Sequence, residues 1–88
     1  MHKSNELSRS VWSTDGRYLM MTHAKFQNSR NASDIQIAKA VVRVYDGDPV
    51  VTGKDAIFYS FSELHSYDLL DELQNAERIG REFIDSLR

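Results

Sequence analysis

The segment from Val44 to Val51, VYDGDPVV, carries residue types that bind cations in other proteins. Asp46 and Asp48 lie two positions apart, as do the first ligands of an EF-hand loop, but the remaining ligands and the terminal glutamate of such a loop are missing. Aspartate, glycine and proline each favour turns for separate physical reasons. We therefore interpret residues 46–49 as the turn of a β-hairpin rather than as a cation site.

The same region has a superficial likeness to a phosphate-binding loop. A Walker loop has four residues between its glycines and then a lysine followed by serine or threonine. Here five residues separate Gly47 from Gly53, and Asp55 follows Lys54. An aspartate at that position would repel the phosphate, so the sequence does not predict a phosphate cradle.

Metal and catalytic chemistry have few candidate residues. The chain has no cysteine, and its three histidines are His2, His23 and His65. Zinc needs three or four well-placed ligands, and His2 belongs to a terminus that we expect to be disordered. No serine sits in a nucleophile-elbow motif. We predict no catalytic residue, no metal site and no cofactor, and hence a protein that is not an enzyme.

Cationic residues are interleaved with aromatic residues on the predicted strands, and this pattern indicates a candidate nucleic-acid surface. Single-strand binders use cations to contact phosphates and aromatic rings to stack bases. The candidate residues are Trp12, Arg17, Tyr18, Lys25, Lys39 and Arg43. An ordinary solvated sheet face would account for the same residues, so nucleic-acid binding by a single-strand regulator is the alternative function.

One segment adds a resemblance to a known family. Residues 52–73, TGKDAIFYSFSELHSYDLLDEL, resemble the part of single-strand-binding transcriptional coactivators in which a Gly-Lys pair precedes a short strand and a helix start. The resemblance covers about a quarter of the chain. It implies four strands followed by a helix, although this chain lacks the lysine-dense region of the family and has an acidic net charge.

Apolar residues occupy both sides of the predicted strands, yet one helix can cover only one face of a sheet. Leu19, Met21, Val42 and Val44 are the residues that we expect at an exposed interface. Exposed apolar patches of this kind mark protein–protein contacts, and a two-fold dimer is the economical way to cover one. The favoured function is therefore a small binding or adaptor module that contacts an unknown protein partner and forms a homodimer.

The elements that must position these residues follow from apolar periodicity and turn residues. We predict an α+β fold in which an antiparallel β-meander of about four strands precedes one long C-terminal α-helix packed on one sheet face. Residues 1–6 are expected to be disordered and residues 7–88 to form one domain. The strands are expected at about 7–13, 17–26, 35–45 and 50–61, and the helix at about 66–87. Tight turns are expected at Asp15-Gly16 and at 46–49, and a loop at 27–34.

The predicted C-terminal helix has a regular apolar stripe with one glycine in it. Ser62 or Ser66 could serve as its N-cap. Gly80 lies in the stripe, which predicts that the helix backbone approaches the sheet closely there. Glu77 and Arg81 have the spacing of an i,i+4 ion pair on the solvent-facing side.

The composition of the whole chain indicates where in the cell the protein is expected. The 88-residue chain has a net charge of −2, which opposes attachment to nucleic acid or anionic lipid through global charge. It has no run of about eighteen apolar residues and no signal-peptide pattern at its start. Together with the lack of cysteine, this predicts a soluble cytoplasmic protein without membrane contact.

Overall fold

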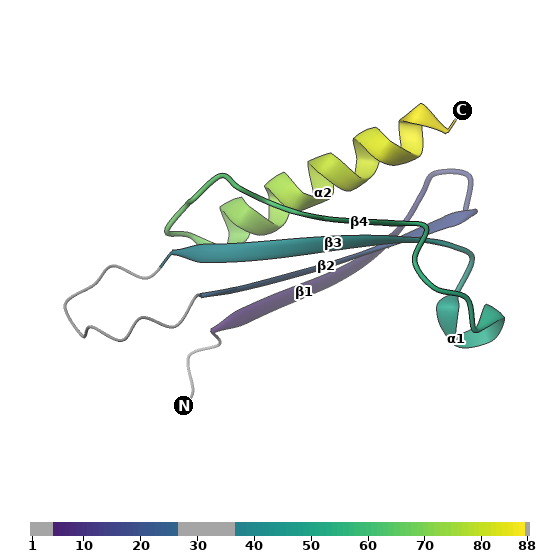
Figure 1. Cartoon of the computed structure of the whole chain (residues 1–88), viewed down its shortest axis with the longest axis horizontal. Coiled ribbons are helices and arrows are strands. Elements are labelled where there is room, and N and C mark those ends of the chain that lie inside the picture. The colour runs from purple at the N-terminus through teal and green to yellow at the C-terminus, as the bar shows by residue number, and fades with distance from the viewer. Residues whose placement is uncertain (1–4, 27–36, 88) are drawn as a thin grey trace.

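The computed structural model describes residues 5–26 and 37–87. It contains one four-stranded antiparallel sheet of order β1-β2-β3-β4 and a C-terminal helix packed on the sheet, so the predicted α+β meander is confirmed (Figure 1). The strands are β1 (Glu6–Trp12), β2 (Tyr18–Phe26), β3 (Ala38–Asp46) and β4 (Phe58–Phe61); the helices are α1 (Pro49–Thr52) and α2 (Leu69–Ser86). Neither helix is long and apolar enough to span a bilayer within the described residues.

Some predicted segments fall outside this description. Residues 1–4 of the predicted disordered terminus, the predicted loop at 27–34 and the predicted strand start at 35–36 lie outside the described residues. Glu6, which the sequence also predicts to be disordered, is the first residue of β1.

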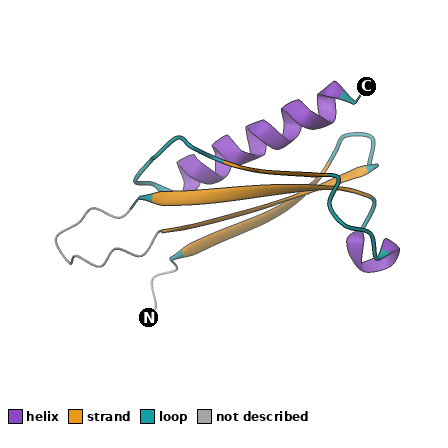
Figure 2. Ribbon diagram, viewed as in Figure 1, coloured by secondary structure: helices purple, strands orange, loops and turns teal. Residues whose placement is uncertain are grey.

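The core lies between α2 and one face of the sheet, which we name the covered face (Figure 2). Alternate side chains of β2 and β3 point toward the helix because successive residues in a strand point to opposite faces. The buried apolar residues of the two strands on this face are Tyr18, Met20, Ala24, Ala38, Ala40, Val42 and Val44. Leu69, Leu73, Ala76 and Ile84 of α2 pack against them.

Gly80 marks the place where α2 comes closest to the sheet. A Cβ atom at this position would lie 2.6 Å from Met20 Sδ and 2.8 Å from Val42 Cγ2. Both distances are too short for real carbon contacts, so only glycine allows this separation. The predicted close approach of helix and sheet is confirmed.

The turn between β1 and β2 forms at Asp15-Gly16, as predicted, but it is longer than a two-residue turn. Ser13 N–H donates to Tyr18 O at 2.8 Å, and Gly16 N–H donates to Ser13 O at 2.9 Å. Gly16 has a φ of 72°, a left-handed conformation that glycine adopts without steric cost. The connection therefore spans residues 13–17 between the two strands.

The hairpin predicted at residues 46–49 is wrong. Asp48 caps the short helix α1 by accepting a hydrogen bond from Val50 N–H at 2.9 Å, and Pro49 is the first helical residue. Gly53, with a φ of 66°, ends this helix and donates to Pro49 O at 2.9 Å. Asp, Pro and Gly favour helix caps as well as turns, so the residue types alone did not distinguish the two.

The fourth strand accordingly begins at Phe58 instead of at residue 50. Val44 pairs with Phe58, not with Val51. None of the residues of α1 is buried, and the short helix projects away from the sheet (Figure 1).

The N-cap of α2 is Asp68, so the prediction of a serine cap is wrong. Asp68 Oδ1 accepts a hydrogen bond from Leu70 N–H at 2.9 Å. Ser66 lies before the cap, where its Oγ accepts from Asp68 N–H at 3.1 Å. Ser62 Oγ instead accepts from Asn75 Nδ2 at 2.6 Å, which joins the end of β4 to α2.

Glu77 does not lie on the solvent side of α2, which corrects the predicted pair with Arg81. Its side chain is 3% exposed and faces β1. Arg9 Nε donates to Glu77 Oε2 at 2.6 Å, and Arg9 Nη2 donates to Glu77 Oε1. This two-bond ion pair fastens the edge strand β1 to the helix.

Candidate functional site

The sheet has a second face, opposite α2, on which no described element packs. We name it the open face and define it by the cross-strand register. Its residues are Glu6, Ser8, Ser10 and Trp12 of β1, Leu19, Met21, His23 and Lys25 of β2, Lys39, Val41, Arg43 and Tyr45 of β3, and Tyr59 and Phe61 of β4.

Three large aromatic side chains on the open face are about half exposed. The exposed fractions are 46% for Trp12, 53% for Tyr59 and 54% for Phe61. Tyr59 and Phe61 lie two residues apart on β4, so their Cα atoms are about 7 Å apart along the strand. Exposed apolar surface can mark an interaction site, so these three residues make the open face the candidate site.

Three cations share the open face with these rings: Arg43 is in register with Tyr59, and Lys25 and Lys39 lie one pair beyond Val41 and Phe61. Lys25 and Lys39 are directly opposite each other in the register of β2 and β3. Neither ammonium has an ion-pair partner among the described residues, although like charges directly opposite each other destabilise a sheet. The guanidinium carbon of Arg43 lies 4.9 Å from the ring centre of Tyr59, so the two form a cation–π pair.

The structure brings together four of the six residues predicted for nucleic-acid binding. Trp12, Lys25, Lys39 and Arg43 share the open face, and the first three of these are on three different strands. Tyr59 and Phe61 belong with them but were missed. Tyr59 and Phe61 can be assigned to the same face as Arg43 only from the register in which β4 pairs with β3. The hairpin predicted at 46–49 implied a different register.

The other two predicted nucleic-acid residues do not belong to this face. Tyr18 is 8% exposed and lies on the covered face. Arg17 lies in the turn before β2, where its Nε donates to Asp46 Oδ1 at 3.4 Å and its guanidinium covers the Tyr18 ring at 5.1 Å. The hydrogen bond to Asp46 and the negative charge of that carboxylate raise the pKa of Arg17.

The predicted interface also divides between the two faces. Leu19 and Met21 lie on the open face, where Met21 is 39% exposed and Leu19 is buried between its register neighbours Trp12 and Tyr45. Val42 and Val44 are fully buried beneath α2, so their assignment to an exposed interface is corrected.

A cavity of about 340 Å³ opens at the edge of the open face, beside β3 and β4. Its lining includes Lys39, Val41, Tyr59, Phe61, Glu63 and His65, together with Ala38, Ala40 and Ser62. It is therefore continuous with the aromatic and cationic residues described above.

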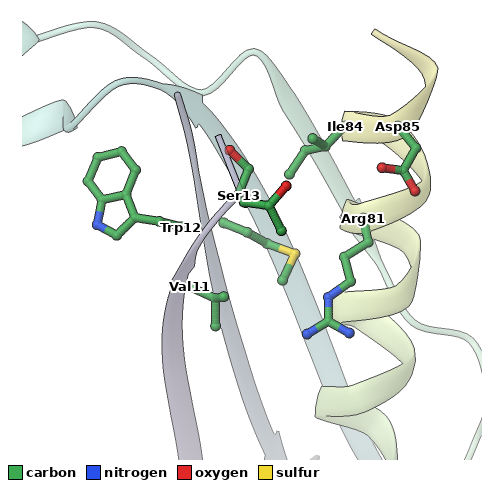
Figure 3. Close-up of a pocket in the computed structure, with 8 residues that line it drawn as sticks. Val11, Trp12, Ser13, Arg81, Ile84 and Asp85 are labelled. Carbon is green, nitrogen blue, oxygen red and sulfur yellow. The ribbon is translucent and has the colours of Figure 1, made fainter. Parts of the chain in front are cut away.

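A second cavity, of about 360 Å³, lies at the other edge of the sheet, between β1 and the C-terminal half of α2. Val11, Met20 and Ile84 supply apolar lining, and Arg81 extends toward the cavity from the helix (Figure 3). The indole of Trp12 points away from it, and Asp85 places a negative charge beside Arg81 (Figure 3). The mixed charges at its rim do not select one class of ligand.

Ser8, His23 and Glu6 form a row of neighbouring side chains that has the residue types of a catalytic triad. Ser8 Oγ lies 2.7 Å from His23 Nδ1, and His23 Nε2 lies 3.5 Å from Glu6 Oε2. The Glu6 side chain is 63% exposed, and neither cavity described above is lined by any of the three. Acyl transfer needs a water-excluded site with oxyanion donors, so this row is better described as a set of polar contacts at the surface.

Metal coordination has no candidate cluster in the part of the chain that the structure describes, because no three His, Asp or Glu side chains converge there. His23 contacts Ser8 and Glu6, and His65 lies in an exposed loop with a φ of 58°.

Comparison with known proteins adds no relative to this picture: no protein-family model, curated protein or solved structure matches the chain.

Proposed function

We propose that this protein is a non-enzymatic binding module that holds single-stranded nucleic acid on its open face. The observation that carries the proposal is that three cations, Lys25, Lys39 and Arg43, share one uncovered sheet surface with three half-exposed aromatic rings. Cations that track phosphates and rings that stack bases are the two components of single-strand binding.

Charge favours a polyanionic partner over a neutral one. The open face has three cationic side chains and one carboxylate, that of Glu6, which lies near His23. A phosphate placed between Lys25 and Lys39 would relieve the repulsion between their ammonium groups. Lysine is also depleted at the centre of protein–protein interfaces, where its desolvation is costly.

The aromatic residues favour a single strand over a duplex. Paired bases are stacked within a duplex and do not present their faces to a protein, whereas unpaired bases can stack on exposed rings. The guanidinium of Arg43 on the Tyr59 ring extends this flat surface.

A salt titration tests the proposal. A labelled oligothymidylate of about ten nucleotides, within the site sizes of known single-strand modules, is titrated with the full chain and followed by fluorescence anisotropy. Three phosphate contacts predict that log K falls with log salt with a slope of about −2, since single strands lose about 0.7 per contact. The double variant Lys25→Ala, Lys39→Ala should reduce the slope to about −0.7.

Lys54→Ala is the matched control, because Lys54 is an exposed lysine outside the four strands. Its slope should equal that of the wild-type chain. Lack of binding at about 50 mM salt, where phosphate contacts are strong, would overturn the proposal.

A second candidate function uses the same face. Met21 and Val41 lie between the aromatic residues, so a second copy of the chain could cover the open face through apolar contacts. Sedimentation at micromolar concentration distinguishes the two, because a homodimer has twice the 10.1 kDa mass of the chain. The interaction with a protein partner that we predicted from the sequence would proceed through the same residues.

A further inference from the structure

Residues 63–65 form a bulge beside the open face, between two backbone hydrogen bonds to β3. Ser62 N–H donates to Ala40 O at 2.9 Å, and Ala38 N–H donates to Ser66 O at 2.9 Å. The chain thus leaves β3 after Ser62 and returns to it at Ser66. Of the three residues in between, Glu63 and His65 line the 340 Å³ cavity and form one wall of it.

Helix α2 holds this wall from behind. Asn75 Nδ2 donates to Ser62 Oγ at 2.6 Å, and Ser66 N–H donates to Glu72 Oε1 at 2.6 Å. Glu72 is fully buried, which is rare for a carboxylate, and this hydrogen bond fixes the end of the bulge. Two side chains of the helix therefore pre-form the cavity wall.

His65, in the same wall, has a backbone conformation that costs free energy. Its φ of 58° is the only positive value at a residue other than glycine in the described part of the chain. Such a conformation costs of order 1 kcal/mol and persists where the surroundings fix it, often at ligand sites. Here the hydrogen bonds on either side of the bulge fix it.

The cavity has the size and lining for one small planar group. Its volume of about 340 Å³ is at the low end of the range for ligand sites, which is roughly 300–1,000 Å³. Val41 and Phe61 provide apolar surface, and Lys39 and Glu63 provide one cation and one carboxylate. Neither charge has an ion-pair partner among the described residues.

We propose that this cavity takes one unstacked base of the bound strand and selects a base with an exocyclic amine, of which cytosine is the smallest. The inference rests on the proposed function. Phe61 stacks the base, the Glu63 carboxylate accepts a hydrogen bond from the N4 amine, and Lys39 neutralises the adjacent phosphate. Carboxylate side chains are the usual acceptors for this amine in base recognition.

Thymine presents a carbonyl oxygen where cytosine presents the amine. That oxygen would face the Glu63 carboxylate with no proton between them, so the cavity disfavours thymine. The expected consequence is a preference for cytidine over thymidine strands that depends on Glu63 alone.

Anisotropy titrations with labelled oligocytidylate and oligothymidylate of about ten nucleotides measure this preference. The wild-type chain should bind the cytidine strand about tenfold more tightly, as one good base contact provides. Glu63→Ala should bind both strands equally, and so should Glu63→Gln, because its amide can accept from the N4 amine of cytosine or donate to O4 of thymine. Glu82→Ala removes a carboxylate from the exposed side of α2 and should keep the full preference.

The outcomes separate the two proposals. Equal binding of both strands by the wild-type chain would overturn the base-selecting cavity and leave single-strand binding intact. Binding of neither strand at low salt would overturn the proposed function and the cavity with it, and is the result expected if the cavity takes a side chain of a protein partner. A preference that survives Glu63→Ala would also overturn the assignment.

Discussion

At the scale of single residues, the contacts that matter most join α2 to the sheet. Gly80 sets the distance between the two layers, and the pair of Arg9 and Glu77 fastens the edge strand. The sequence predicted the first of these because a glycine in an apolar stripe indicates a close approach of the helix backbone. It did not predict the second, because a glutamate and an arginine 68 residues apart carry no local signal of pairing.

Gly80→Ala should destabilise the protein by about 1 kcal/mol, because overpacking costs roughly 1–3 kcal/mol and improved helix propensity returns at most about 1. Val42 is stiff and fully buried and cannot move aside for the new methyl group. Urea unfolding measures the effect. Gln74→Ala, on the exposed side of the same helix, should change stability by less than about 0.5 kcal/mol. A Gly80→Ala variant more stable than the wild type would contradict the close approach.

Arg9→Ala should lower the urea midpoint distinctly, because it leaves the buried Glu77 carboxylate without its counter-ion. Arg17→Ala is the matched control: its partner Asp46 is half exposed and regains water when the arginine is lost. Equal midpoints for the two variants would show that the Arg9 pair contributes nothing beyond a surface ion pair.

The same pair has a pH signature. Hydrogen bonding to Glu77 and its negative charge raise the pKa of Arg9 from an already high value. A raised pKa means that the stabilisation is complete below the ordinary pKa and is lost only as the pH rises through the raised one. The difference in midpoint between wild type and Arg9→Ala should therefore stay constant from about pH 6 to pH 9.

At the scale of elements, the strands and the long helix were predictable and the caps were not. The apolar periodicity of β2, β3 and α2 identifies these elements even when their first and last residues are predicted slightly wrongly. The segment at 46–53 failed because Asp, Pro and Gly stop a strand in either case, and only the hydrogen bonds of Asp48 and Gly53 show that a helical turn follows. Serine and aspartate are both favoured at the N-cap, so the sequence led us to predict a serine cap for α2, whereas Asp68 holds that position.

Asp68→Ala should cost about 1 kcal/mol of stability, because Leu70 N–H loses its acceptor at the helix start. Asp68→Asn should retain most of the wild-type stability, since its side-chain oxygen can accept the same hydrogen bond. Urea unfolding of both variants checks this. If both lose stability equally, the negative charge, and not the cap, is the important property of Asp68.

At the scale of the whole molecule, the charge on the open face bears on the proposed nucleic-acid binding more directly than the net charge of −2 does. Lys39 and Arg43 lie at odd-numbered positions of β3 and so point to one face. Val42 and Val44 lie at even-numbered positions with Ala38 and Ala40 and point to the other face. This pattern was enough to predict that the valines lie on the covered face. A helix can pack closely on small residues, whereas unpaired cations need contact with water. Assigning all four strands to faces nevertheless required the register, which depends on the turns that sequence patterns left ambiguous.

Trp12 offers the most direct test of the central claim, because it is the single tryptophan of the chain and lies on the open face. Its emission is followed while an oligonucleotide of about ten residues is added at low salt. A strand stacked on the open face predicts saturable quenching of this emission, reversed by added salt with the same midpoint as the anisotropy signal. Unchanged Trp12 emission at saturating oligonucleotide would contradict the claim that the open face is the binding surface.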